Sequence, residues 1–331
     1  MTIPKIELAD DLSVCRILNG MWQVSGGHGQ IDPKDAVLDM LEYHKNGFTT
    51  WDLADIYGPA ESFIGEFRKQ LPPKDLQNSH ALTKFVPNPG PMSKSIVEYY
   101  IDQSLQKMNT EIIDMIQFHW WDYNNPSYLD ALSNLTKLQN DGKIKHLGLT
   151  NFDTERIKIM IEHGFKLISN QVQYSILDQR PEKLMTPYCK KHNISILAYG
   201  TLLGGFLSEK YLNSPEPHRA DLNTSSLQKY HNMIDAWGGW GLFQELLQIL
   251  SKIAKKHDSS IANISTKFIL DKPGVAGVII GSRLGLSEHR QDNARVFDIV
   301  LENDDLALIR SVTSKSNDLF GLIGDCGDEY R

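Results

Sequence analysis

The chain has 331 residues, of which 41% are hydrophobic and 23% charged, so it can bury a large core. Its 34 Lys and Arg residues against 41 Asp and Glu residues give a net charge of −7, and it has no basic run, which argues against a nucleic-acid or anionic-membrane partner. The three cysteines, Cys15, Cys189 and Cys326, are odd in number and far apart, which argues against a disulfide framework and a Cys-rich zinc site.

The ends of the chain and its overall pattern predict an untargeted protein with a single domain. The N-terminus lacks a basic start followed by an apolar stretch, and no apolar run approaches the ~20 residues that cross a bilayer. We therefore expect a cytoplasmic protein with reduced thiols and no membrane association. Neither an internal repeat nor a linker divides residues 1–331, so we expect one domain.

In chain order, the first predicted element is a small N-terminal β-hairpin, formed by residues 5–8 and 14–16. After it, short apolar, β-branched runs alternate with longer amphipathic stretches, a pattern typical of βα units around a parallel sheet. These units predict an α/β fold of the (β/α)₈ or TIM-barrel type. Its eight strands are expected at residues 17–22, 49–53, 81–85, 112–119, 144–150, 167–171, 195–199 and 275–281.

Between the predicted strands lie helical patterns with recognisable ends. A helix over 33–45 stops at Asn46-Gly47, and one over 128–139 stops at Asp141-Gly142, as C-terminal caps prefer. After the seventh strand, a long loop rich in Gly, Ser, Pro and His runs from residue 202 to about 241, before a helix over 242–257. In barrel enzymes, a long segment after the carboxyl end of a strand often contains the loops that bind cofactor and substrate. The tail from 311 to 331 is only weakly patterned.

The ends of the second, third and fourth strands carry an Asp, a Tyr, a Lys and a His that can act together: Asp52, Tyr57, Lys84 and His119. In a parallel barrel these strand ends converge on one mouth. A free tyrosine has a pKa near 10, so a neighbouring ammonium, Lys84, is expected to lower it. Asp52 would hold Lys84, and a neutral His119 would hydrogen-bond a substrate carbonyl oxygen. Taken singly, a Lys or Asp at a strand end is more often a solvated surface charge, and a His among aromatic residues is more often part of the core.

The order and spacing of these residues resemble the aldo-keto reductase superfamily. The resemblance rests on Asp52-x₄-Tyr57-Gly58-x₂-Glu61, Lys84 and His119, and continues through the segments 148–152, 170–174, 197–202 and 278–283. It implies that Tyr57 is the general acid of a carbonyl reduction, that Lys84 lowers its pKa, that Asp52 pairs with Lys84 and that His119 orients the substrate. It also implies a nicotinamide cofactor, NADP (NADPH), with NAD possible.

The same resemblance implies a set of cofactor-binding residues. Asp52 lies in this site, Thr150, Asn151 and Gln171 would hold the carboxamide, Tyr199 would stack on the nicotinamide, and the loop with Gly200, Leu202 and Gly205 would approach the pyrophosphate. The residues expected near the adenosine and its 2′-phosphate are Gly281, Ser282, Arg283, His289, Arg290 and Asn293. Thr150 stands where the family often has Ser. The segment 281–293 is two residues longer than the common version, which leaves open which arginine meets the phosphate.

Aromatic residues after the first and fourth strands are expected to wall the substrate pocket: Trp22, Trp120, Trp121 and Tyr123. They favour a flat or apolar carbonyl substrate, although sugars also stack on such rings. No two histidines lie within one helix turn, so we expect no His-pair zinc site.

Two other functions stay open. A glycosidase could use two of the carboxylates of Asp52, Asp55 and Glu61, but this leaves Lys84 and His119 unexplained. The second is a cofactor-binding regulatory subunit similar to the potassium-channel beta subunits of this superfamily. The natural small-molecule substrate and the oligomeric state are not predicted.

Overall fold

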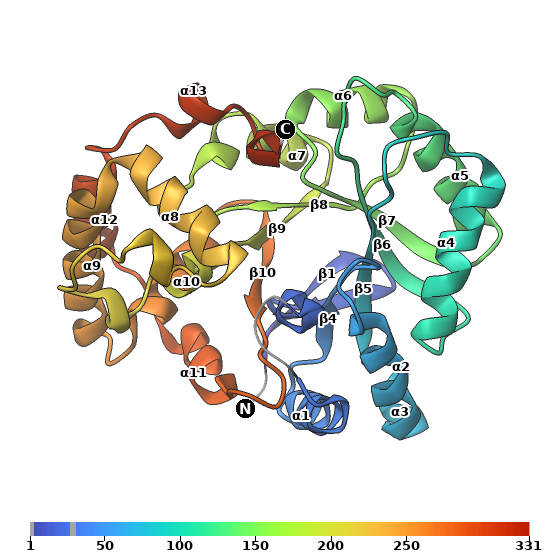
Figure 1. Cartoon of the computed structure of the whole chain (residues 1–331), viewed down its shortest axis with the longest axis horizontal. Coiled ribbons are helices and arrows are strands. Elements are labelled where there is room, and N and C mark those ends of the chain that lie inside the picture. The colour runs from blue at the N-terminus through green and yellow to red at the C-terminus, as the bar shows by residue number, and fades with distance from the viewer. Residues whose placement is uncertain (1–2, 27–30, 331) are drawn as a thin grey trace.

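The computed structural model describes residues 3–26 and 31–330 and contains a closed barrel of eight parallel strands, with helices packed around it (Figure 1). Neighbouring strands follow the order β10-β3-β4-β5-β6-β7-β8-β9. Their bounds are β3 Ile17–Gly20, β4 Thr50–Asp52, β5 His80–Phe85, β6 Ile113–His119, β7 Ile144–Thr150, β8 Ser169–Gln173, β9 Ser195–Tyr199 and β10 Val275–Gly281. The predicted barrel is confirmed, with each predicted strand present.

The first barrel strand is shorter than predicted. β3 ends at Gly20, and the following residues form a 3₁₀ turn, Trp22–Ser25. The Met21 N–H donates instead to the carbonyl of Asp52, which anchors the start of this turn to the end of β4. Trp22 therefore stands above the strand ends rather than within the barrel wall.

The N-terminal hairpin, β1 (Lys5–Ala9) and β2 (Leu12–Cys15), packs against the amino-terminal end of the barrel. Leu12 and Val14 lie in one buried cluster with Leu18, Leu82 and Met115 of the barrel strands. Burying this apolar layer stabilises the fold, because each fully buried Leu or Val contributes roughly 1.5–3 kcal/mol. The hairpin thus closes one end of the barrel, and the opposite end carries the ends of the parallel strands.

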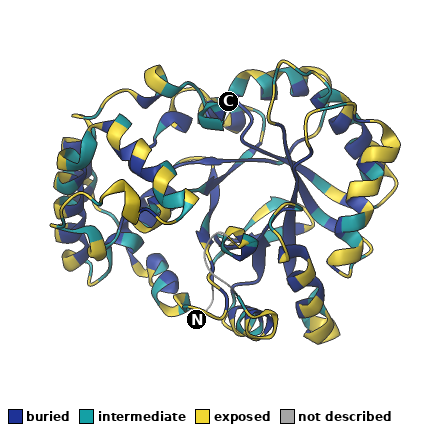
Figure 2. Ribbon diagram, in the orientation of Figure 1, coloured by how far each residue is buried: buried dark blue, intermediate teal, exposed yellow. Residues whose placement is uncertain are grey.

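The helices cover the outside of the strands, with buried faces toward the barrel and exposed faces outward (Figure 2). The first helix shows how the sequence sets an end: Asp32 caps it by accepting from the N–H groups of Lys34 and Asp35, and Pro33 occupies its first position. The bounds are α1 Pro33–Lys45, α2 Ala60–Gln70, α3 Pro73–Leu76, α4 Lys94–Lys107, α5 Tyr128–Asn140, α6 Thr154–Glu162, α7 Met185–Lys191, α8 Ser225–Trp237, α9 Gly239–Lys256, α10 Ile261–Leu270, α11 Arg290–Ala294, α12 Asn303–Thr313 and α13 Leu319–Ile323.

The excursion after β9 contains regular structure in addition to loop. Short 3₁₀ turns at Leu203–Gly205, Glu209–Tyr211 and Arg219–Asp221 precede helix α8, and Gly238, at φ 154°, joins α8 to α9. The weakly patterned tail also folds, as the end of α12, helix α13 and a 3₁₀ turn at Asp328–Tyr330. In this last turn, Glu329 pairs with Arg180 and the hydroxyl of Tyr330 lies 3.0 Å from that of Tyr199, at the end of β9.

Within residues 3–26 and 31–330, no helix is both long and apolar enough to cross a membrane. The single-domain organisation expected for residues 1–331 stays a prediction.

Candidate active site

A buried layer of polar side chains crosses the barrel near the carboxyl ends of its strands. The ammonium of Lys84 donates to Asp52 Oδ2 at 2.7 Å and to the carbonyl of Leu53 at 3.1 Å. Asp52 Oδ1 accepts from the amides of Gln117, at 2.8 Å, and Gln171, at 2.6 Å. The ion pair is thus fully hydrogen-bonded, as a buried pair must be to persist. Gln117 was not predicted from the sequence.

Tyr57 stands above this layer with the ammonium of Lys84 5.1 Å from the centre of its ring. Burial raises the pKa of the Tyr57 phenol well above its ordinary value, and the negative charge of Asp52 adds to this. The pKa of Tyr57 is thus not lowered overall, contrary to the expectation, because desolvation of the phenol is the larger effect. Asp52, 2.7 Å from the ammonium of Lys84, offsets part of the charge that would favour a phenolate, and the role of Lys84 in lowering this pKa stays a prediction. Burial also lowers the pKa of Lys84, against the effect of Asp52.

His119 ends β6 and is buried, with Nδ1 3.0 Å from the carbonyl oxygen of Thr150. A carbonyl oxygen only accepts, so Nδ1 carries the proton, and in a neutral ring Nε2 is then an acceptor. This changes the expected role: a neutral His119 in this orientation does not donate to a substrate carbonyl. It accepts from a hydroxyl group, and it donates through Nε2 only once the ring is doubly protonated.

The residues expected to hold a carboxamide lie together at the ends of β7 and β8. Asn151 adopts a left-handed backbone conformation, φ 57°, which Asn tolerates better than most residues, and its amide oxygen lies 2.9 Å from the hydroxyl of Tyr199. Gln171 gives its amide N–H groups to Asp52 and Gln117. The hydroxyl of Thr150 is buried and has no hydrogen-bond partner among the described residues. A buried hydroxyl in that state fits a site that a polar ligand completes.

The glycines after β9 do not all face the same surroundings. A Cβ on Gly200 would come within 2.4 Å of the Tyr230 hydroxyl, so helix α8 explains why this residue is small. At Gly205, φ 103°, a Cβ would meet no atom within 4 Å. Leu202 is partly buried against the core. Of this loop, Gly205 presents the more open backbone.

The segment after β10 separates the two candidate arginines. Arg290 donates to Asp39 Oδ1 at 2.5 Å, pairs with Glu288 at 3.1 Å, and stacks over Tyr43. Arg283 is exposed. The other predicted members of this site divide by burial: Ser282 and Asn293 are buried, and Gly281 and His289 are exposed.

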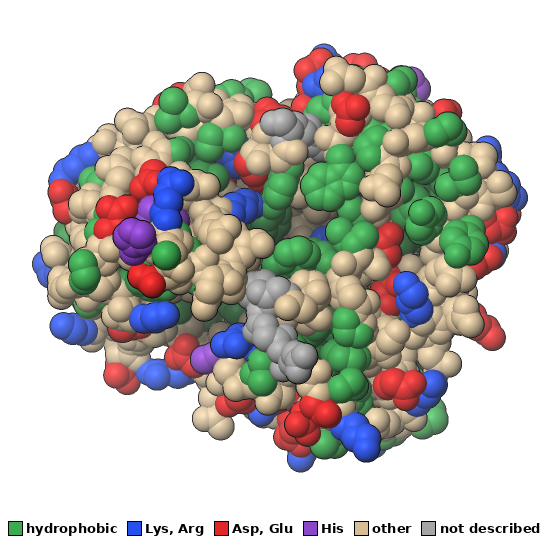
Figure 3. Space-filling view, viewed as in Figure 1, with side chains coloured by type: hydrophobic (Ala, Val, Ile, Leu, Met, Phe, Trp, Pro, Cys, Tyr) green, Lys and Arg blue, Asp and Glu red, His purple; other side chains and the backbone are tan. Residues whose placement is uncertain are grey.

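Two of the four predicted aromatic residues border the side chains of Tyr57 and His119. The ring of Trp22 lies 4.9 Å from that of Tyr57, and the ring of Trp121 lies 4.3 Å from that of His119, both edge to face. Trp22 and Trp121 are 39% and 38% exposed. They form part of an apolar wall, and Figure 3 shows hydrophobic side chains around a hollow at the centre of this face.

The other two aromatic residues do not form such a wall. Trp120 is fully buried, and its indole N–H donates to the backbone carbonyl of Asp122 at 2.7 Å, so the prediction that it lines the pocket is wrong. Tyr123 stacks on Phe152, and its hydroxyl accepts from the N–H of Asp153 at 3.0 Å. Tyr123 thereby supports the loop that carries Asn151.

Two of the three carboxylates considered for a glycosidase, Glu61 and Asp52, are engaged elsewhere, which leaves Asp55, an acceptor of the Val86 N–H at 3.2 Å, without a second carboxylate for that reaction. Glu61 is 1% exposed, accepts from the hydroxyl of Thr83 at 2.8 Å and pairs with Lys107. Asp52 is held by Lys84 and two amides. A carboxylate buried in this way is not placed to protonate or attack a sugar, so no observation favours that alternative.

The C-terminal tail contributes residues that the sequence did not indicate. Glu329 pairs with the buried guanidinium of Arg180 at 3.0 Å, and Arg180 also makes two 2.8 Å hydrogen bonds to Asp178. This anchor holds Tyr330 with its hydroxyl 3.0 Å from that of Tyr199. The ammonium of Lys229, on α8, donates to the same Tyr330 hydroxyl. The weak sequence pattern of the tail does not predict that it packs at the mouth of the barrel.

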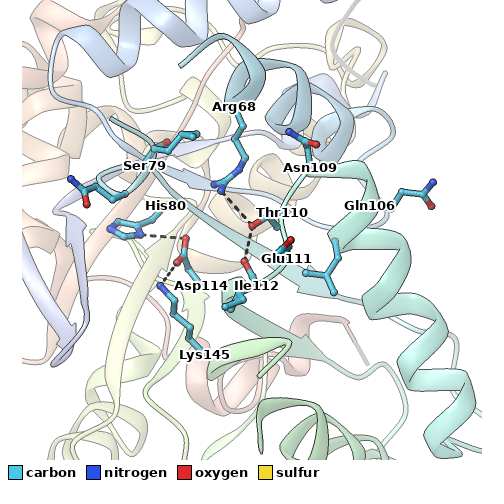
Figure 4. Close-up of a pocket in the computed structure, with 13 residues that line it drawn as sticks. Arg68, Ser79, His80, Gln106, Asn109, Thr110, Glu111, Ile112, Asp114 and Lys145 are labelled. Atoms are coloured by element: carbon cyan, nitrogen blue, oxygen red, sulfur yellow. Dashed lines mark hydrogen bonds and ion pairs between the residues drawn. The ribbon is translucent and has the colours of Figure 1, made fainter. Parts of the chain in front are cut away.

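A separate cavity of about 770 Å³ lies at the amino-terminal ends of β5, β6 and β7 (Figure 4). There His80 and Lys145 both face the carboxylate of Asp114, at 3.3 and 3.1 Å, and Arg68 points to the hydroxyl of Thr110. These side chains pair with one another, and barrel enzymes build their active sites at the opposite end of the strands. The candidate active site is therefore the mouth that contains Tyr57.

Comparisons with known proteins show which family the chain is similar to. A family model described as the Aldo/keto reductase family matches residues 16–314. The NADH-specific methylglyoxal reductase of Escherichia coli (strain K12) is 24% identical over 327 residues, which cover 91% of this chain and 95% of that protein. The flagellar radial spoke protein 5 of Chlamydomonas reinhardtii is 29% identical over 179 residues, which cover 49% of this chain and only 34% of that protein.

Among solved structures, a thermostable aldo-keto reductase in complex with the inhibitor epalrestat has the same fold. It superposes with a TM-score of 0.72 at 22% sequence identity, and the match covers 94% of this chain and 100% of that one.

Proposed function

Since the chain belongs to the aldo/keto reductase family, an oxidoreductase family that acts on carbonyl compounds, we propose that it reduces a small aldehyde or ketone to the alcohol with NADPH, Tyr57 donating the proton. The observation that carries the proposal is the grouping of Tyr57, the Asp52–Lys84 ion pair and His119 at one end of the barrel. The reverse reaction, oxidation of an alcohol or sugar, uses the same groups.

The residues around Thr150 support a nicotinamide site. A nicotinamide dinucleotide, when bound, supplies the hydride for the carbonyl carbon. Thr150, Asn151 and Gln171 would hold its carboxamide: the partnerless Thr150 hydroxyl offers a donor, and the Gln171 amide oxygen is left to accept because its nitrogen is committed to Asp52. Tyr199 would stack on the ring, and the open backbone at Gly205 would approach the pyrophosphate.

Tyr57 is the proposed proton donor because its phenol stays protonated near neutral pH. In reduction the proton leaves Tyr57 Oη for the oxygen of the substrate. The ammonium of Lys84, 5.1 Å from the ring, then stabilises the phenolate that forms. His119 is the proposed positioning residue: its Nε2 accepts from the hydroxyl of the alcohol, or donates to the carbonyl oxygen when the ring is protonated.

The proposed cofactor preference is NADPH, with Arg283 as the residue that binds the 2′-phosphate. The side chain of Arg283 is exposed to solvent, and that of Arg290 is largely buried against Asp39 and Glu288. The Escherichia coli relative is named as NADH-specific, so both cofactors belong in the test. We also propose that residues 1–331 form one domain and that the protein is cytoplasmic. Its three cysteines are free thiols.

The test is a spectrophotometric assay with the purified protein. NADPH or NADH is mixed with methylglyoxal or an aromatic aldehyde, and the absorbance of the reduced cofactor is followed. We expect oxidation of NADPH that depends on the aldehyde and on the hydroxyl of Tyr57. Tight cofactor binding without turnover of any aldehyde or ketone would overturn the proposal and favour a cofactor-binding subunit.

A further inference from the structure

Lys229 places a positive charge in an aromatic surrounding next to the candidate active site. It lies on α8 and is partly buried. Its ammonium is 4.2 Å from the ring centre of Tyr330, 5.2 Å from that of Tyr199 and 5.3 Å from that of Tyr230, and it donates to the Tyr330 hydroxyl. Three tyrosine rings and one phenol thus surround a charge that in proteins is usually paired or well solvated.

Two other cations near the mouth, Lys84 and Arg180, are paired with carboxylates. Lys84 is paired with Asp52 at 2.7 Å, and Arg180 with Asp178 at 2.8 Å and Glu329 at 3.0 Å. Within the part of the chain that the structure describes, no carboxylate lies at ion-pair distance from Lys229. This ammonium is therefore available to an anionic oxygen, which is a stronger acceptor than the neutral phenol it now contacts.

Lys229 contacts one tyrosine expected beside the cofactor of the proposed reaction and another that approaches the substrate side. Tyr199, on one side, is the residue expected against the nicotinamide. Tyr330, on the other, approaches the rings of His119, at 6.5 Å, and Trp121, at 6.3 Å, which border the substrate side. The Arg180–Glu329 ion pair fixes the tail that presents Tyr330. Through Tyr330 the ammonium is therefore linked to the residues that border the substrate side.

We propose that Lys229 is a specificity-determining residue that binds an anionic group, a carboxylate or a phosphate, carried by the carbonyl substrate at a distance from its carbonyl carbon. This inference rests on the proposed function and names its substrate class. The chain has a net charge of −7, so its overall field does not attract anions and the recognition must come from a local cation. The low-dielectric surroundings of the three rings strengthen that interaction.

The experiment compares matched aldehydes that differ in charge: para-carboxybenzaldehyde with its methyl ester, and succinic semialdehyde with butanal. For the wild type, kcat/KM is expected to favour the charged member of a pair by roughly ten- to a hundred-fold, the range of a charge-assisted hydrogen bond. Lys229→Met should remove this preference, mainly through KM, and Lys229→Arg should retain most of it. The preference should also shrink as NaCl is added, because salt screens a partly exposed charge.

The matched control is Lys210→Met. Lys210 is an exposed lysine of the same excursion whose ammonium lies 5.0 Å from the ring centre of Tyr211, so the substitution makes the same change of net charge. The ratio between charged and uncharged aldehydes should stay as in the wild type. Dissociation constants for NADPH, measured by fluorescence on each variant, separate an effect on substrate from one on cofactor.

Three results would overturn the inference. Equal kcat/KM for both members of each pair in the wild type would remove the anion subsite and leave the reductase function standing. A parallel loss for charged and uncharged aldehydes in Lys229→Met, with weaker NADPH binding, would assign the ammonium to the cofactor pyrophosphate. No reduction of any aldehyde by a wild type that still binds NADPH would overturn the proposed function, and the inference with it.

Discussion

The guanidinium of Arg290 donates to the carboxylate of Asp39 at 2.5 Å, joining the segment after β10 to helix α1. Both side chains are largely buried, and Glu288 pairs with the same guanidinium at 3.1 Å. An arginine engaged in this way has little charge left for a ligand. Arg283, seven residues earlier and exposed, is the better candidate for a phosphate.

The first prediction concerns cofactor preference. Arg283→Ala should weaken NADPH binding by roughly ten- to a hundred-fold and leave NADH binding nearly unchanged, because a guanidinium makes charge-assisted hydrogen bonds to a 2′-phosphate that a hydroxyl cannot match. Arg290→Ala is the control: it should lower the thermal stability while keeping the ratio of the two dissociation constants. Fluorescence titrations measure both. Equal affinity of the wild type for NADPH and NADH would remove the phosphate role.

Tyr57→Phe should reduce carbonyl reduction by a factor of about 10²–10⁴, the usual contribution of general acid catalysis, with NADPH affinity close to that of the wild type. The substitution removes the hydroxyl and keeps the ring that packs against Trp22, 4.9 Å away, so the fold should be retained. Steady-state kinetics and a cofactor titration measure the two effects. Turnover at the wild-type rate would show that another group donates the proton.

Lys84→Met should abolish reduction or move its pH–rate profile to higher pH. Removing the ammonium leaves the buried Asp52 carboxylate without its 2.7 Å partner, and that charge disfavours a phenolate at Tyr57. Breaking a buried pair from one side also costs about 3–5 kcal/mol of stability. The double variant Asp52→Asn/Lys84→Met should recover part of that stability without recovering activity. A single variant with a normal rate and an unchanged pH profile would make Lys84 a purely structural partner.

Asp55 should make the protein less stable as the pH rises toward 7. Burial raises the pKa of Asp55 to about 7, against a smaller effect of the Val86 N–H that it accepts at 3.2 Å. Because the folded-state pKa lies above the unfolded value, the folded chain holds a proton that the unfolded chain has lost between about pH 4 and 7. The contribution of Asp55 to the free energy of unfolding is fully present below about pH 4. It is lost as the pH rises through about 7, and the total loss is up to about 4 kcal/mol.

Asp55→Asn tests this pH dependence, because the amide keeps an acceptor for Val86 and carries no charge. Its free energy of unfolding, measured by denaturant at several pH values between 4 and 8.5, should fall less with pH than that of the wild type, and the variant should be the more stable protein at the upper end. Parallel curves for the two proteins would mean that Asp55 stays ionised in the fold.

The sequence alone determined where the elements lie and which residues end the strands. Apolar periodicity is a local property, so the eight strands, and helix ends such as the one at Asn46, could be read from the sequence. Because all strands of a parallel barrel end at one mouth, the positions of Asp52, Lys84 and His119 at the ends of three strands were enough to predict that they come together. The chemical roles assigned to these residues stay predictions.

Only the tertiary structure decided which charges pair with one another and what covers the mouth. Burial and the charge of Asp52 raise the pKa of Tyr57, against expectation, and Arg290 is paired with Asp39. Tyr330 reaches Tyr199 from 131 positions away in the chain. Such contacts depend on how distant segments pack once the barrel has closed, and a residue's charge or type does not state its partner. The fold could therefore be predicted from the local sequence pattern, whereas the electrostatics of the site depend on tertiary packing.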